Sequence, residues 1–89
     1  MFRPLPGFKA RYHDLTLYVA SDFDEWRVLI AGPDGTIHGS RQITEAKAKD
    51  HARAMAESYI REQKHEDPAP IPPPEWSPLG KGEWLNWRA

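Results

Sequence analysis

The chain has 89 residues, with twelve Lys and Arg against thirteen Asp and Glu, a net charge of −1, and no cysteine. This length favours one small domain, and the lack of cysteine excludes disulfides, thiolate zinc ligands and cysteine nucleophiles within it. No run of about 18 apolar residues and no apolar leader occurs, so we expect a cytoplasmic protein without membrane contact. The balanced charge counts against a dedicated nucleic-acid binder, which usually carries a positive excess.

The first fourteen residues contain Pro4, Pro6 and Gly7, together with the basic residues Arg3, Lys9 and Arg11. Prolines and glycines interrupt regular structure. We therefore expect residues 1–14 to form an irregular arm.

Residues 15–20 and 26–31 alternate between apolar and polar side chains, which is the period of half-buried strands. The tetrapeptide Gly32–Gly35 (GPDG) follows as a hairpin turn, because proline presets one φ angle and Gly35 can adopt a positive one. A third strand is expected to begin at Thr36. The sheet would contribute these residues to the core: Leu15, Leu17, Val19, Trp26, Val28, Ile30 and Ile37.

A helix is predicted from Thr44, its N-cap, to the stop formed by Asp67 and Pro68. One apolar stripe recurs at helical spacing, and most of its members are alanine, so the helix can approach a sheet closely. The stripe consists of Ala48, Ala52, Met55, Ala56 and Tyr59.

The expected fold class is α+β: a three-stranded antiparallel β-meander with one C-terminal α-helix packed on one face, within residues 15–66. One helix covers only one face of such a sheet. The second face would carry Thr16, Tyr18, Arg27, Leu29, His38 and Ser40.

Residues 67–89 form a proline-rich linker and a tryptophan-rich tail. The stretch PAPIPPP favours polyproline II, a stiff spacer of about 3.1 Å per residue. It would deliver Trp76, Trp84, Leu85 and Trp87 to another surface. The second face of the sheet is the expected destination, and a second copy or a different partner is the alternative.

Catalytic and ligand-binding patterns are not evident. The four histidines lack the paired spacing of a zinc site, no serine lies in a nucleophile elbow, and no phosphate-binding loop occurs. We expect no enzyme activity, no cofactor, no metal and no small-molecule substrate.

The segment WRVLIAGPDGTIHGSRQITEAKAKDHARAMAESYI resembles the arm-binding modules of phage-type integrases, in which a Trp-Arg strand, an Asp-Gly hairpin and a T-x-E-A helix start recur. That resemblance implies a sheet face that enters a DNA groove through Tyr18, Arg27, His38 and Arg41. The stretch is also similar to the second half of double-stranded RNA-binding domains, whose last helix has an A-K-x-x-A pattern, here Ala48, Lys49 and Ala52 with Lys47 adjacent.

Two functional hypotheses follow. The preferred one is a non-enzymatic adaptor that acts through protein contacts, with a protein partner or as a homodimer joined at a sheet edge. Its partner-binding residues would be Trp76, Trp84, Leu85, Trp87, Tyr18 and Leu29. The alternative is a small nucleic-acid-binding module that uses Arg27, His38, Arg41, Lys47 and Lys49.

Overall fold

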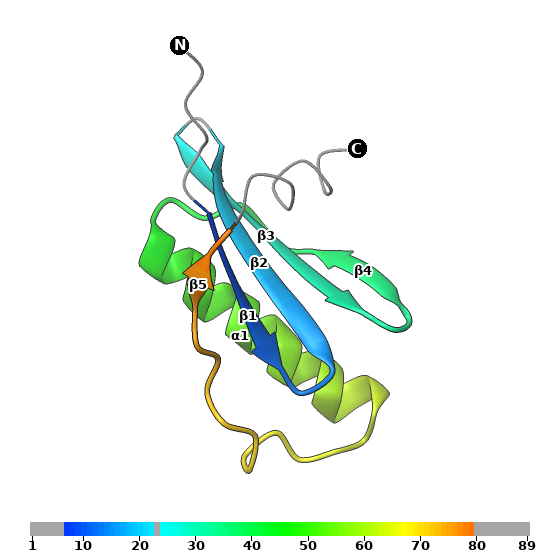
Figure 1. Ribbon diagram of the computed structural model, residues 1–89. Helices are drawn as coiled ribbons and strands as arrows, with labels where there is room; N and C mark the ends of the chain where they lie inside the picture. The colour runs from blue at the N-terminus through cyan, green and yellow to red at the C-terminus, as the bar shows by residue number, and fades with distance from the viewer. Residues whose placement is uncertain (1–6, 23, 80–89) are drawn as a thin grey trace.

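The computed structural model describes residues 7–22 and 24–79 of the chain (Figure 1). Four strands precede the single helix and a two-residue strand follows it. The elements are β1 (Gly7–Tyr12), β2 (Leu15–Asp22), β3 (Glu25–Gly32), β4 (Gly35–His38), α1 (Glu45–Gln63) and β5 (Ser77–Pro78).

The strands form one antiparallel sheet in the order β4-β3-β2-β1-β5. The α+β class, the antiparallel sheet and the single helix are confirmed. The sheet has five strands where the sequence predicted three, because β1 and β5 extend the meander beyond β2.

Strand β1 corrects the prediction of an irregular arm over residues 1–14. Phe8, Ala10 and Tyr12 alternate with Lys9 and Arg11, and the apolar set pairs with the core positions of β2. Ala10 and Tyr12 are buried. This period-two pattern is typical of a strand. Pro4 and Pro6 precede β1 in the sequence and Gly7 is its first residue, so none of the three interrupts it.

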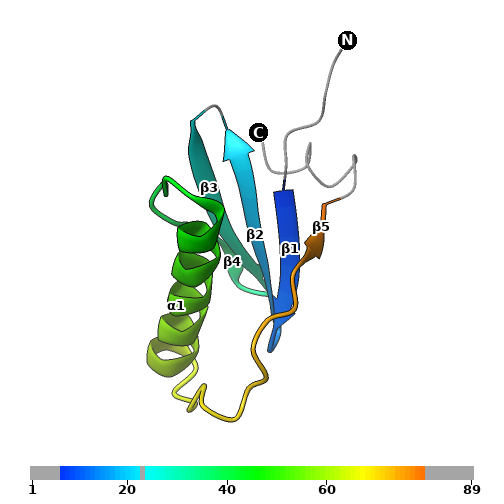
Figure 2. The same cartoon turned by 90° about the vertical axis from the view of Figure 1, so that its left-hand side faces the viewer.

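Helix α1 packs across one face of the sheet, as Figure 2 shows from the side. Thr44 is its N-cap, and the Thr44 hydroxyl accepts a hydrogen bond of 3.2 Å from the Lys47 amide, as predicted. The buried stripe consists of Ala48, Ala52, Ala56 and Ile60. Met55 and Tyr59, which the prediction included, are only partly buried.

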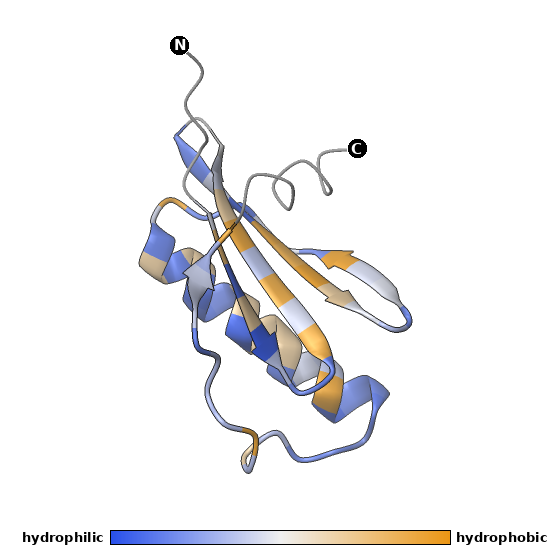
Figure 3. Ribbon diagram, in the orientation of Figure 1, coloured by the Kyte–Doolittle hydropathy of each residue, from blue (hydrophilic) through white to orange (hydrophobic). Residues whose placement is uncertain are grey.

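The main core lies between α1 and the sheet. Figure 3 shows orange apolar residues alternating with paler, more hydrophilic ones along β2. Leu17, Val19 and the three buried alanines of α1 have no exposed surface. Because alanine is small, the helix backbone sits close to the sheet and the strands supply most of the apolar volume. Two of the predicted core residues of the sheet are not buried: Trp26 is partly buried against the core, and Ile37 is 39% exposed on the edge strand β4.

The β3–β4 turn, the β1–β2 turn and the end of the helix have defined backbone angles or contacts. The turn Pro33–Asp34 joins β3 to β4, and Gly35 has the expected positive φ, 132°. The β1–β2 turn contacts the C-terminal end of α1 through an ion pair of Asp14 with Lys64, and His13 Nε2 lies 3.1 Å from Glu66 Oε2. His65, with φ of 55°, ends the helical segment in a left-handed conformation.

After α1 the chain returns along the outside of β1 as a proline-rich strap, residues 68–76, and ends its described part in β5 and Leu79 (Figures 1 and 2). Ile71 and Trp76 pack against the helix-side core, and the Lys49 ammonium lies 5.7 Å from the Trp76 ring centroid. The prediction that the tail lies on the second sheet face is therefore wrong for Trp76. Trp84, Leu85 and Trp87 lie outside the described residues.

Pro78 is compatible with β5 because of its register. The Leu79 amide donates to the Gly7 carbonyl at 3.0 Å, so the backbone groups of Gly7 point outward to β5. Those of Phe8, which is opposite Pro78, point inward to β2. Proline consequently removes no ladder bond at this position.

Across residues 7–22 and 24–79, no helix has the length and apolar character needed to cross a lipid bilayer.

Candidate functional site

The sheet face opposite α1, here called the open face, is built from the strand residues that alternate with the core set. Three cross-strand rows form most of it, and a fourth row, Asp22–Glu25, lies at the end of the β2–β3 hairpin. The three rows are Arg11–Thr16–Ala31–Thr36, Lys9–Tyr18–Leu29–His38 and Gly7–Ala20–Arg27.

The three rows contain three permanent cations, Lys9, Arg11 and Arg27, and no Asp or Glu. Asp22 is the register partner of Glu25 in the fourth row, and the Glu25 carboxylate lies 3.5 Å from the Arg41 guanidinium. Because the whole chain has a net charge of −1, this is a local separation of charge. The open face is therefore suited to an anionic partner.

A small apolar cluster lies within the cationic rows. Ala20 and Leu29 are buried at 0% and 4% exposure, with Tyr18 and Leu79 packed against them. Gly7 makes room for this packing, since a Cβ there would lie 2.6 Å from Leu79 Cδ1. The open face thus combines an aromatic and aliphatic centre with surrounding positive charge.

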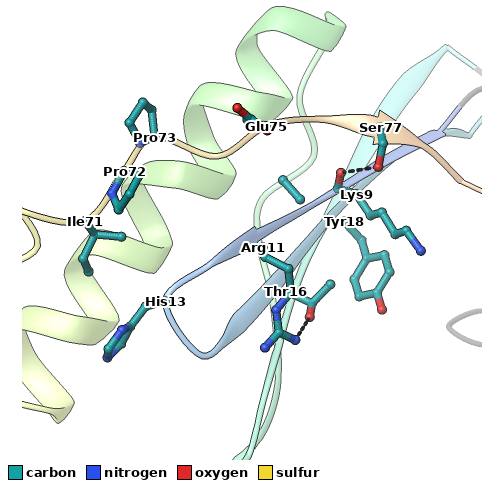
Figure 4. Close-up of a pocket in the computed structure, with 11 residues that line it drawn as sticks. Lys9, Arg11, His13, Thr16, Tyr18, Ile71, Pro72, Pro73, Glu75 and Ser77 are labelled. Carbon is teal, nitrogen blue, oxygen red and sulfur yellow. Dashed lines mark hydrogen bonds between the residues drawn. The ribbon is translucent and has the colours of Figure 1, made fainter.

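A groove of about 680 Å³ borders the open face between β1 and the strap. Figure 4 shows Lys9, Arg11, Thr16 and Tyr18 on the strand side of this groove, with Ile71, Pro72 and Pro73 on the strap side. Its volume lies within the range of about 300 to 1,000 Å³ of typical ligand sites.

Arg11 has a defined orientation in the groove. Its Nη1 donates to Thr16 Oγ1 at 3.1 Å, the neighbouring position across the strand pair (Figure 4). The structure gives the guanidinium no other partner among the described residues, and five N–H donors are available on such a group. Arg11 is therefore preoriented to receive a carboxylate or phosphate.

The nucleic-acid residues predicted from the sequence do not form one surface. Arg27 and His38 lie on the open face, and Arg41, after β4, has its guanidinium 3.5 Å from the Glu25 carboxylate. Lys47 and Lys49 belong to α1, on the opposite side of the sheet. The Lys49 ammonium is 2.8 Å from Glu45 Oε2 and 4.0 Å from the Phe8 ring centroid.

The predicted adaptor residues are also divided. Tyr18 and Leu29 are register partners on the open face, whereas Trp76 contacts the helix-side core. The sheet therefore separates Trp76 from the two residues with which the prediction grouped it.

The perturbed titratable groups lie where the turns of the sheet meet the end of α1, and Asp14 among them borders Arg11 and Thr16 at one end of the open face. A hydrogen bond from Lys64 lowers the pKa of Asp14, and the same bond raises the pKa of Lys64. The Tyr59 hydroxyl donates to Asp34 Oδ2 at 2.8 Å, and this bond raises the pKa of Tyr59. Burial raises the pKa of Tyr12. These groups connect structural elements, and no cluster of three metal-ligating side chains occurs in the part of the chain that the structure describes.

Lys9 and Arg11 are the site residues that the sequence prediction missed. Their signal was present, because GFKARY alternates in the same way as the segments that were assigned as strands. The prolines at positions 4 and 6 favour an irregular arm, but the alternation of GFKARY determines the structure from Gly7 onward.

No protein-family model matches the chain, and no curated protein or solved structure matches it either.

Proposed function

We propose that this protein is a non-enzymatic adaptor module that binds a protein partner with an acidic surface on its open face. The observation on which this rests is the grouping of Lys9, Arg11 and Arg27 around Tyr18 and Leu29 in three rows that contain no carboxylate.

The apolar centre supports a protein partner. Protein interfaces typically have an aromatic or aliphatic centre with arginine enriched, surrounded by a polar rim. Tyr18, half-buried on the Ala20–Leu29 cluster, supplies the aromatic surface of such a centre, and Arg27 lies beside it. A partner carrying carboxylates would complement the rim, which increases association rate and specificity more than affinity.

Nucleic acid would match the same cations less well. The other basic residues that were expected to contact it lie on α1 or in an ion pair with Glu25, and the net charge is −1. Tyr18 and His38 are the two aromatic rings in the three rows, and Leu29 stands between them in register, whereas single-strand binders usually stack successive bases on several aromatic residues.

Selection of a displayed random dodecapeptide library on the immobilised full chain tests the proposal. We expect enrichment of peptides with more Asp and Glu than the unselected library. Synthetic copies should bind the wild type in solution and bind the Arg27→Glu variant at least about tenfold more weakly, because one charge-assisted contact is replaced by a like-charge pair. The matched control is Lys47→Glu, which makes the same charge change on an exposed position of α1.

Two results would contradict the proposal. One is a selection without enriched sequences. The other is fluorescence anisotropy that detects binding of generic single-stranded or duplex nucleic acid at about 50 mM salt and its loss at about 200 mM, because that salt dependence is typical of phosphate recognition.

A further inference from the structure

The groove beside β1 exists because the β1–β5 ladder stops early. Strand β5 pairs with Phe8 and Lys9 alone. The backbone groups of Gly7 and Lys9 point outward, away from β2. The Gly7 carbonyl accepts from the Leu79 amide, and the Lys9 carbonyl accepts from the Ser77 hydroxyl. Arg11 is two residues further along β1, so its backbone N–H and C=O also point outward. Within the described residues, no strand pairs with Arg11 on that side.

The strap cannot continue this ladder. In the β1–β5 register the position opposite Arg11 is Glu75, and the positions before it are Pro72, Pro73 and Pro74. Prolines have no N–H to donate, and Ile71 is held against the helix-side core. The strap therefore diverges from β1 and leaves the outer edge of the strand facing the groove.

The walls of the groove differ in chemistry. The strand wall presents the Lys9 and Arg11 cations, and the strap wall presents proline rings with one carboxylate, Glu75. His13 lines one end, where its Nε2 lies 3.1 Å from Glu66 Oε2. An occupant of this groove would find backbone hydrogen-bonding groups and positive charge on one side and apolar rings on the other.

We propose that the groove binds an extended, acidic segment of the protein partner, which adds to the outer edge of β1 at Arg11 and places a carboxylate on the Arg11 guanidinium. This inference rests on the proposed adaptor function and identifies the kind of partner. A strand in the groove would complete the backbone bonding of Arg11, as in other cases of strand addition to a sheet edge.

The chain's own C-terminal residues are a poorer match in charge. Residues 80–89 contain one acidic residue, Glu83, and two basic ones, Lys81 and Arg88. A groove lined by Lys9 and Arg11 would favour a segment with the opposite balance.

The test uses a fluorescein-labelled heptapeptide of alternating glutamate and valine, titrated with the full chain and followed by anisotropy. We expect saturable binding, no binding of the peptide with lysine in place of glutamate, and about tenfold weaker binding by Arg11→Ala, because one charge-assisted bidentate contact is lost. Lys47→Ala, an equal charge change on α1, should bind as the wild type does. Circular dichroism melts verify that each variant is folded.

Two N-methylated versions of the heptapeptide test strand addition directly. One has methyl groups on the glutamates and the other on the valines, so each blocks one edge of the extended peptide. Addition to β1 requires that one version loses about tenfold in affinity and the other binds normally. Equal effects of the two versions, or binding that is unchanged in Arg11→Ala, would overturn the inference.

The outcomes separate this inference from the proposed function. Library peptides that depend on Arg27, together with a heptapeptide that fails to bind, would refute the groove and leave the adaptor function standing. A library selection without enriched peptides, together with a heptapeptide that fails to bind, would refute the function itself. Sedimentation experiments can also show whether the full chain self-associates. Self-association that the heptapeptide does not reverse would refute the proposal that an acidic segment of another protein occupies the groove.

Discussion

The helix-covered face of the sheet and the open face are built from the same strands, yet they differ in what fills them. The covered face has fully buried aliphatic residues against three alanines of α1 that have no exposed surface. The open face has two buried apolar residues, Ala20 and Leu29, and three permanent cations in its rows. Along each strand, the residues that pack against α1 alternate with the residues that carry charge on the open face.

This difference separates stability from recognition in a domain that has little surface to bury. A chain of this length buries only about 60 to 65% of its unfolded surface, so the close contact between alanine and sheet must supply much of the stability. The open face contributes less packing and can therefore tolerate the side chains that a partner requires. Substitutions on the two faces should consequently have effects of very different size.

The largest effect is expected from Ala52→Leu. Ala52 has no exposed surface and lies in the close helix–sheet contact. Three additional carbon atoms would force the helix away from the sheet, and we expect a loss of about 3 kcal/mol in the free energy of unfolding, measured by urea denaturation.

Ala54→Leu is the matched control, because Ala54 is exposed on the same helix. It should change the free energy of unfolding by less than about 0.5 kcal/mol. Equal destabilisation by the two substitutions would mean that the alanine stripe is not what positions α1.

The covered face was largely predictable from the sequence. The alternation of residues 15–20 and 26–31 gives the register of β2 and β3, and the spacing of Ala48, Ala52 and Ala56 gives the buried side of α1. Each signal is local and regular. Strand β5 could not be predicted in this way, because two residues have no period and their pairing with β1 depends on where the strap returns.

The candidate site was only partly predictable. Tyr18, Leu29 and Arg27 were placed on the correct face because they alternate with core residues. Lys9 and Arg11 were missed with β1, and Trp76 was assigned to the wrong side. Its position follows from the path of the strap and from contact with Lys49, which are tertiary features without a sequence pattern.

Trp76→Ala tests whether the strap contributes to the stability of the helix-covered side. Trp76 packs on the helix-side core beside Lys49, so its removal should lower the free energy of unfolding by about 2 kcal/mol through lost apolar burial and a lost cation–π contact. Glu75→Ala, an exposed neighbour, should have little effect. A tryptophan emission that does not change on unfolding of a Trp26→Phe variant would contradict the packing of Trp76.

Asp14→Asn tests the ion pair between the β1–β2 turn and the end of α1. The Lys64 hydrogen bond lowers the pKa of Asp14 in the folded protein. The stabilisation is therefore present above the unfolded pKa of about 3.9 and is lost as the pH falls through the lower folded value. Thermal melts should show the variant less stable than the wild type at neutral pH. The difference should vanish once the pH is below both values, and a difference that persists there would exclude the ion pair as its source.

The smallest effect on stability is expected from Arg11→Ala on the open face. Arg11 is exposed, and its bond to Thr16 is the one contact that the structure gives its guanidinium within the described residues. Exposed polar contacts of this kind contribute little net free energy, so urea denaturation should show a change below about 0.5 kcal/mol. A loss of unfolding free energy comparable to that of Ala52→Leu would mean that Arg11 is a structural residue. The open face would then contribute to stability at the very residue that is proposed to bind the partner. A variant that is as stable as the wild type yet loses the acidic heptapeptide would instead place recognition on the open side of β1.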